Sequence, residues 1–166
     1  FVLAAGTAYA ATVAGIDLPE ERDGLTLHGA GVLRKGFVFK IYVGALYLAD
    51  SRDAANVLSN VPKRLDIHYC HTTPKRHMVR VAEETLRDNL LPDRLAQHKA
   101  HIAALHEAYR DGRKGGCASL IYRPGAGLTY AVDGETLLSI VDDVFANDYL
   151  RVWLGENPSS ATMKEA

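Results

Sequence analysis

Two β-prone runs separated by a short polar loop constrain this chain more than any other feature. Thr26–Leu33 and Phe37–Leu48 are both rich in β-branched and aromatic residues, and Arg34-Lys35-Gly36 lies between them. A glycine in a short polar loop between two such runs is typical of a β-hairpin. The sequence therefore predicts that these two runs form paired antiparallel strands.

Further strand-like runs occur early and late in the chain. Ala11–Leu18 alternates loosely and ends at Pro19, as an edge strand does. Arg64–His71 alternates between apolar and polar residues, which predicts a strand with two different faces. Two turn segments separate three more short strands: Cys117–Arg123, Leu128–Val132 and Leu137–Val141.

The middle and the end of the chain are predicted to be helical. Asp50–Val61 has the features of a short helix, and Thr73 followed by Pro74 is a good start for a longer one. Pro92 begins another helix that extends through Tyr109, and a last helix covers Asp142–Leu154. This order predicts an α+β domain in which helices pack on one face of an antiparallel sheet.

Residues 1–10 are expected to be the remnant of a secretory signal peptide. An uncharged apolar run, Phe1–Thr7, leads into Ala8-Tyr9-Ala10, which has the small residues that signal peptidase requires before its cut. The mature protein is then an exported domain of residues 11–166. The alternative is that the apolar run is the first strand or helix of the domain.

Composition excludes several classes of partner. The chain has 166 residues, 48% of them hydrophobic, which is typical of one globular domain. A net charge of −1 provides no basic surface for nucleic acid. No apolar stretch approaches the roughly 20 residues of a transmembrane helix. Cys70 and Cys117 could form a disulfide in an exported protein or remain free thiols. A homodimer is compatible with the sequence.

The segment Gly29–Leu48 resembles the signature hairpin of chalcone isomerase-like proteins, in particular their bacterial branch. The resemblance continues through Arg64–His71, the helix after Thr73, the turn Tyr122–Gly127 and Trp153-Leu154-Gly155. It implies an open-faced β-sandwich, in which a large antiparallel sheet carries a layer of helices. It also implies that a small apolar or aromatic ligand lies between the sheet and the helices. Together with the expected signal remnant, the bacterial resemblance leads us to expect a protein that is periplasmic or otherwise exported.

The positions that carry isomerase chemistry in this family are altered here. The resemblance puts Arg34 at the place of the catalytic arginine when counted back from Tyr42, and Leu33 there when counted from the glycines. Tyr42 stands at the threonine position, while the family tyrosine and lysine fall at or near Lys75 and Met78. The expected protein is therefore not an isomerase, although an intramolecular lyase or isomerase of this type is an alternative function.

An arginine with a tyrosine is the pair found in non-catalytic relatives that bind fatty acids. A guanidinium offers paired donors that match a carboxylate, and a phenol adds another. Arg34, Lys40 and Tyr42 would face the same side if the strand ran straight through the turn. We therefore expect a cell-envelope protein that binds a fatty acid or similar amphiphile through Arg34, Tyr42, Lys40, Lys75 and Met78. A solvated polar row is the alternative interpretation of these residues.

The histidines suggest another function, non-covalent haem binding. Five candidate ligands gather around a strand end and the helix that follows: His68, Tyr69, Cys70, His71 and His77. Histidine, tyrosine and cysteine can all be axial ligands of haem, and His68 is the preferred one because it shares a face with Asp66 and Cys70. The chain has no Cys-x-x-Cys-His motif for covalent attachment.

A metal site is not predicted. His98 and His101 are three residues apart on a predicted helix, but structural zinc needs four ligands and catalytic zinc three. No further ligand has a suitable spacing. A solvated helix face is therefore the preferred interpretation of these two histidines.

Overall fold

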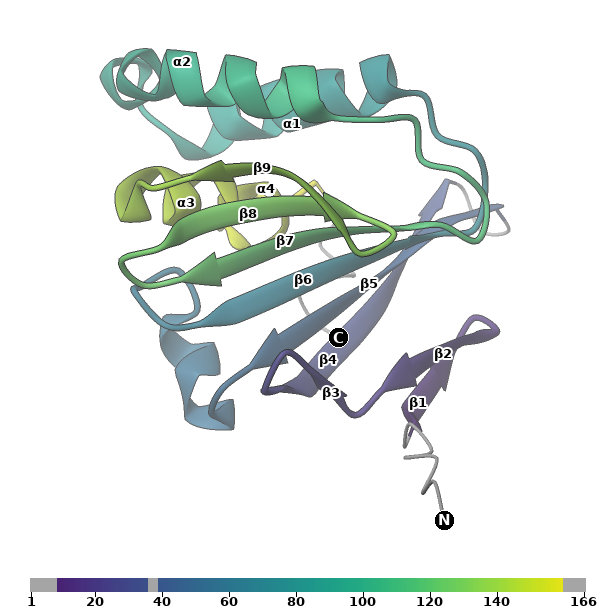
Figure 1. Ribbon diagram of the computed structural model, residues 1–166. Coiled ribbons are helices and arrows are strands. Elements are labelled where there is room, and N and C mark those ends of the chain that lie inside the picture. The colour runs from purple at the N-terminus through teal and green to yellow at the C-terminus, as the bar shows by residue number, and fades with distance from the viewer. Residues whose placement is uncertain (1–8, 36–38, 160–166) are drawn as a thin grey trace.

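A seven-stranded antiparallel sheet forms the centre of the protein (Figure 1). The structure is a computed structural model that describes residues 9–35 and 39–159. Each strand of the sheet pairs with its neighbours in chain order, and the predicted hairpin is confirmed as β4 and β5. The strands are β3 (Glu21–Arg22), β4 (Leu25–Lys35), β5 (Phe39–Leu48), β6 (Lys63–Tyr69), β7 (Cys117–Arg123), β8 (Gly127–Val132) and β9 (Glu135–Ile140).

Parts of two expectations lie outside the described residues. Gly36 of the predicted loop and Phe37 and Val38 of the predicted strand are among them, as are residues 1–8 of the expected signal remnant. Arg34 and Lys35 were expected in the loop, but both are extended and end β4.

Helices cover one face of the sheet, as the order of elements predicted (Figure 1). The main apolar core lies between them and strands β6–β9. None of the helices in the described part of the chain has the length and apolar character needed to cross a membrane. The α-helices of the described residues are α1 (Lys75–Asn89), α2 (Pro92–Ala108), α3 (Asp143–Tyr149) and α4 (Arg151–Leu154), and a 3₁₀ helix, Ser51–Asn56, connects β5 to β6.

The other face of the sheet carries a second, smaller core. It lies under a two-stranded hairpin of β1 (Tyr9–Val13) and β2 (Ile16–Pro19), whose Leu18 is fully buried. The prediction of one strand over Ala11–Leu18 is therefore wrong in one respect, because this segment forms parts of two strands. It turns back on itself at Ala14-Gly15, where both residues have positive φ. Glycine adopts that conformation at no steric cost.

Tertiary contacts change three of the helical predictions. Thr73 does not cap α1, because its backbone bonds with Gly112 in both directions; the Asp111 carboxylate accepts from the Lys75 N–H instead, at 2.7 Å. The last helix breaks at Leu150 into α3 and α4. His98 is buried rather than solvated, because α2 packs on α3 and its Nε2 lies 2.8 Å from Asp148.

The turn between β7 and β8 provides a matched test of this fold. Gly125 and Gly127 both have positive φ, but only Gly127 is in a confined place. A Cβ at Gly127 would lie 2.0 Å from the Ile140 carbonyl oxygen of β9, whereas a Cβ at Gly125 would meet nothing within 4 Å. We expect Gly125→Ala to lower the free energy of unfolding by about 1 to 2 kcal/mol through backbone strain alone.

Gly127→Ala should lower the free energy of unfolding by about 1 to 3 kcal/mol more than Gly125→Ala does, because β9 has to move to admit the methyl group. Urea denaturation followed by circular dichroism measures both variants. Equal costs for the two substitutions would show that β8 and β9 do not approach each other in this way.

Candidate functional site

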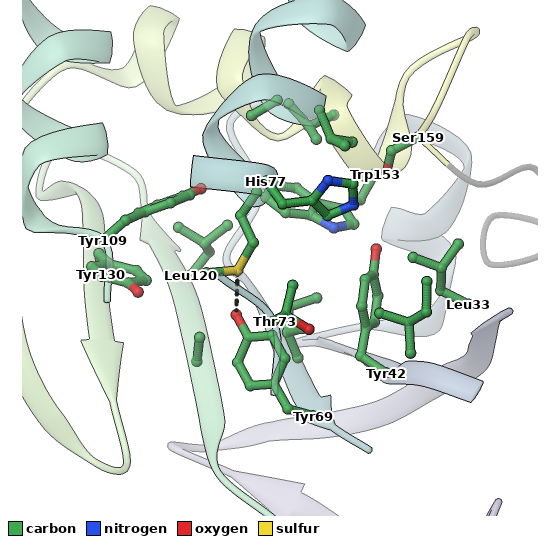
Figure 2. A pocket seen from close by; sticks show the side chains of 17 residues that line it. Leu33, Tyr42, Tyr69, Thr73, His77, Tyr109, Leu120, Tyr130, Trp153 and Ser159 are labelled. Atoms are coloured by element: carbon green, nitrogen blue, oxygen red, sulfur yellow. Dashed lines mark hydrogen bonds between the residues drawn. The ribbon is translucent and has the colours of Figure 1, made fainter. Parts of the chain in front are cut away.

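A cavity of about 170 Å³ lies between the sheet and the helices (Figure 2). Seventeen residues line it, and most of them are apolar. The sheet contributes one wall, which includes Leu33, Ile41, Tyr42, Ile67, Tyr69, Leu120 and Tyr130. Helices α1 and α4 contribute the other, with His77, Met78, Val81, Ala82, Val152 and Trp153.

The periodicities of strand and helix explain this lining. Ile67 and Tyr69 are two residues apart on β6, so both side chains point to the helical face. Val81 and Ala82 follow Met78 on α1 by three and four residues, so all three share the helix face that covers the sheet. The Tyr69 hydroxyl donates to the Met78 sulfur at 3.0 Å and joins the two walls (Figure 2).

A few polar groups gather at one side of the cavity. The Tyr42 phenol is directed towards Trp153 and Ser159 (Figure 2). Burial raises the pKa of Tyr42, and the polar side chains of Trp153 and Ser159 act against that rise. The Ser159 hydroxyl is buried and has no hydrogen-bond partner in the described part of the chain. The Ser159 hydroxyl and the Tyr42 phenol therefore form a small polar patch at this side of the cavity.

His77 lies at the rim of the cavity on an exposed turn of α1. The Arg80 guanidinium, which also pairs with Glu84, lies 3.1 Å from the His77 Nδ1. A guanidinium can only donate, so Nδ1 accepts this bond and Nε2 carries the ring proton. His77 therefore presents a donor at the cavity, with a permanent positive charge behind it.

Comparison with known proteins identifies the family. A sequence model of the chalcone isomerase-like family matches residues 10–166. The chain belongs to the chalcone isomerase-like family. Its structure is similar to the crystal structure of a fatty-acid binding protein from Arabidopsis thaliana, with a TM-score of 0.70 and 14% sequence identity over 91% of this chain and 90% of that one. No curated protein matches the sequence.

Two of the five residues expected to bind a ligand in this chalcone isomerase-like protein line the cavity. They are Tyr42 and Met78. Arg34 and Lys40 do not line it, so the expectation that they face the same side as Tyr42 is wrong. Leu33, which counting from the glycines had put at the arginine position, occupies the cavity wall instead.

An irregular step in the pairing of β4 and β5 is the reason. Leu33 pairs with Tyr42 and Arg34 pairs with Lys40, which leaves Ile41 as an extra residue on β5. Such a bulge interrupts the alternation of side chains along the strand. Residues before and after the extra residue, which would otherwise share a face of the sheet, then point to opposite faces. Ile41 and Tyr42 both reach the cavity, while Arg34 is exposed at the end of the hairpin.

Lys75 belongs to a different hollow. Its ammonium group donates to the Glu107 carbonyl oxygen at 2.7 Å. Together with Arg110 and Arg113 it lines a more polar depression of about 470 Å³ on the far side of Tyr69 and Tyr130. The lysine is held by α2 and does not reach the apolar cavity.

His68, the preferred haem ligand, does not line the cavity either. It alternates on β6 with Ile67 and Tyr69, which do, so it lies on the opposite face of the sheet. Its ring lies 3.9 Å from the Cys117 sulfur. Cys70 and Cys117 are both free thiols.

Sequence reasoning missed several residues of the site. Trp153 was noticed only as part of the family resemblance, and Ser159 and Val152 not at all. His77 was named as a haem ligand rather than as a rim donor. These residues come from segments far apart in the chain, and no local pattern predicts that they meet.

Two alanine variants test whether the cavity is empty space. Ala82 lines the cavity and Ala146 does not, although both are buried on helices. Ala146→Leu should lower the free energy of unfolding by about 1 to 3 kcal/mol, because the added carbons overpack the core. Ala82→Leu should cost less than about 1 kcal/mol or stabilise the fold, because its side chain fills existing space.

Thermal and urea unfolding of the two variants beside the parent protein measures the difference. Similar destabilisation by both substitutions would contradict the cavity.

Proposed function

We propose that this chain is a non-catalytic binding protein, and that it holds a fatty acid or similar amphiphile with its apolar part between the sheet and the helices. The observation that carries the proposal is the cavity, whose lining is apolar except for a cluster of polar groups at one side. This is the arrangement that a molecule with a hydrocarbon tail and a polar head requires. The shared fold with a fatty-acid binding protein supports it.

The size of the cavity limits what it holds without rearrangement. At about 170 Å³ it is similar to an engineered apolar cavity of about 150 Å³ that binds benzene. A ring or a short acyl segment fits this volume. The rest of a long chain has to extend through the opening or displace side chains.

The head group has partners at the rim. No lysine or arginine lines the cavity among the described residues, and an unpaired carboxylate is costly to bury. In our proposal the carboxylate therefore stays near His77 and Arg80, where it meets an Nε2 donor and a guanidinium charge. Tyr42 and Ser159 supply further donors on the inner side.

Fluorescence of Trp153 tests this proposal directly. It is the only tryptophan of the chain and it lines the cavity, so its emission reports an occupant. We expect saturable changes with hexanoate, octanoate and decanoate. Affinity should rise about fourfold per added methylene while the chain still enters the cavity, and should level off for palmitate.

Variants separate the head-group contacts from the tail contacts. Tyr42→Phe and His77→Leu should each weaken decanoate binding about tenfold, because a hydrogen bond to a charged group is lost, and should change decanol binding less. Arg34→Ala is the matched control, and it should change affinity less than about twofold because it is exposed. Absence of any saturable signal would refute the proposal, and so would loss of binding in Arg34→Ala with normal binding in His77→Leu.

We also propose that the protein acts outside the cytoplasm, in the cell envelope. Support comes from the apolar run that ends in Ala8-Tyr9-Ala10. Tyr9 and Ala10 open β1, and a cut after Ala10 leaves the pairs of Ala11, Thr12 and Val13 with β2 in place. The domain therefore tolerates the expected cleavage.

Expression in a Gram-negative host, with Met and two lysines added before Phe1, tests this location. We expect periplasmic protein that begins at Ala11, and loss of cleavage in Ala10→Arg because signal peptidase needs a small residue there. N-terminal sequencing of the periplasmic fraction measures it. Uncleaved protein confined to the cytoplasm would contradict the proposal.

A further inference from the structure

We propose that Asp66, His68 and Cys117 bind a zinc ion on the face of the sheet that points away from the cavity. One oxygen, one nitrogen and one sulfur ligand atom of these residues all lie within 4.8 Å of one another. Carboxylate, imidazole and thiolate are the three side-chain ligands that Zn²⁺ takes in proteins. Three protein ligands with an open fourth position are typical of zinc sites that bind a further molecule.

The pairing of β6 with β7 brings the three residues together. His68 lies directly opposite Cys117, and Asp66 lies directly opposite Ser119. Residues opposite each other on antiparallel strands share a face, as do residues two apart on one strand. The two strands are adjacent and central in the sheet, so their backbones hold the ligands in a fixed arrangement (Figure 1).

The Asp66 carboxylate has one oxygen without a hydrogen-bond partner among the described residues. Its Oδ1 accepts from the Arg64 Nε and from the Ser119 hydroxyl, each at 2.7 Å. Its Oδ2 is buried and has no hydrogen bond in the described part of the chain. The residue has 0% of its surface exposed, and a buried carboxylate oxygen without a partner is costly.

Two further buried groups without hydrogen bonds interact with this carboxylate. The buried Tyr47 hydroxyl and the buried Arg22 Nε also lack hydrogen-bond partners in the described part of the chain. Arg22 forms a long ion pair with Asp66. Burial and the Asp66 charge raise the pKa of Tyr47, and Arg22 acts against that rise. Three of the four buried side-chain polar atoms that lack a partner in the described residues thus belong to this cluster. Buried polar groups without hydrogen bonds are therefore concentrated on this face of the sheet.

The thiol and the imidazole have a separation that suits a shared metal. Cys117 Sγ and His68 Nε2 are 3.9 Å apart, which is long for a strong hydrogen bond. Zn–S and Zn–N bonds at a tetrahedral angle put sulfur and nitrogen about 3.6 Å apart. Small side-chain rotations therefore suffice. Both residues are only partly buried, so an ion and a water ligand can enter from solvent.

Two arginines lie near the site, and their positive charges have to be compensated when a metal ion binds. Arg64 is already paired with Asp23 and with Asp66 Oδ1, so its charge is largely compensated. Arg22 lies 3.8 Å from Asp66 Oδ2, and its side chain is 41% exposed. An ion at Oδ2 therefore displaces the Arg22 guanidinium towards solvent, where the charge is hydrated.

A redox role for the same thiol fits the surroundings less well. Burial raises the pKa of Cys117 to about 12, so without a metal the thiol stays protonated and is a poor nucleophile. Burial also lowers the pKa of His68, which keeps the ring neutral with a lone pair available. Zinc binds the thiolate form of cysteine, so binding at Cys117 releases the thiol proton to solvent.

Cobalt absorption spectroscopy on the protein without a histidine tag tests the site. Co²⁺ in tetrahedral sulfur, nitrogen and oxygen coordination gives visible d–d bands and a thiolate charge-transfer band in the near ultraviolet. We expect both bands at one equivalent of Co²⁺ and their loss when Zn²⁺ is added. Zn²⁺ should also raise the melting temperature of the parent protein, because it binds only the folded state.

Three variants make the test specific. Cys117→Ser and His68→Ala should remove the charge-transfer band or weaken Co²⁺ binding by at least about tenfold. Loss of a residue that binds the metal directly should weaken binding more than loss of a residue that only hydrogen-bonds to a metal ligand. Cys70→Ser, which removes the other free thiol, should leave the spectrum unchanged. Circular dichroism confirms that each variant is folded.

The opposite pattern would overturn the proposal. It fails if the parent protein shows no bands and no Zn²⁺ stabilisation at millimolar metal, as expected if only water fills the cluster. It also fails if the bands survive in Cys117→Ser or disappear in Cys70→Ser. The site and the cavity lie on opposite faces, so fatty-acid titration of Trp153 fluorescence gives an independent result.

Discussion

The pairing of β5 with β4 on one side and β6 on the other is the constraint on which the rest of the structure depends. Val43, Ala45 and Tyr47 of β5 are buried on the face that the β1–β2 hairpin covers. The residues between them face the helices. Because successive side chains of a strand point to opposite faces, one set of backbone bonds fixes both cores at once.

The cavity follows from the same pairing. The extra residue at Ile41 brings Ile41 and Tyr42 to the helical face together and carries the charged end of the hairpin away from it. The resulting wall is apolar next to α1 and α4. In the proposed complex the positive charge for a carboxylate comes from the first turns of α1, through His77 and Arg80, rather than from the hairpin.

The two faces of the central strands provide different chemistry. On β6, Ile67 and Tyr69 belong to the apolar cavity wall, while Asp66 and His68 belong to the polar cluster opposite. The single layer of the sheet therefore separates the apolar cavity from the proposed metal ligands. The cavity lining and the proposed metal ligands have no side chain in common.

The sequence by itself determined the elements of this fold and their order, because each depends on residues close together in the chain. The hairpin, the alternation of β6 and the helix after Pro74 follow from local periodicity and turn chemistry. Tyr42 and Met78, which the sequence predicts as ligand-binding residues, both line the cavity. Only the tertiary structure decided that Arg34 leaves that space, since a bulge changes a strand's phase without a distinct sequence signal. It alone decided that His68 lies beside Cys117 and that His77 and Trp153 line the same cavity, because pairing and packing between distant segments set those positions.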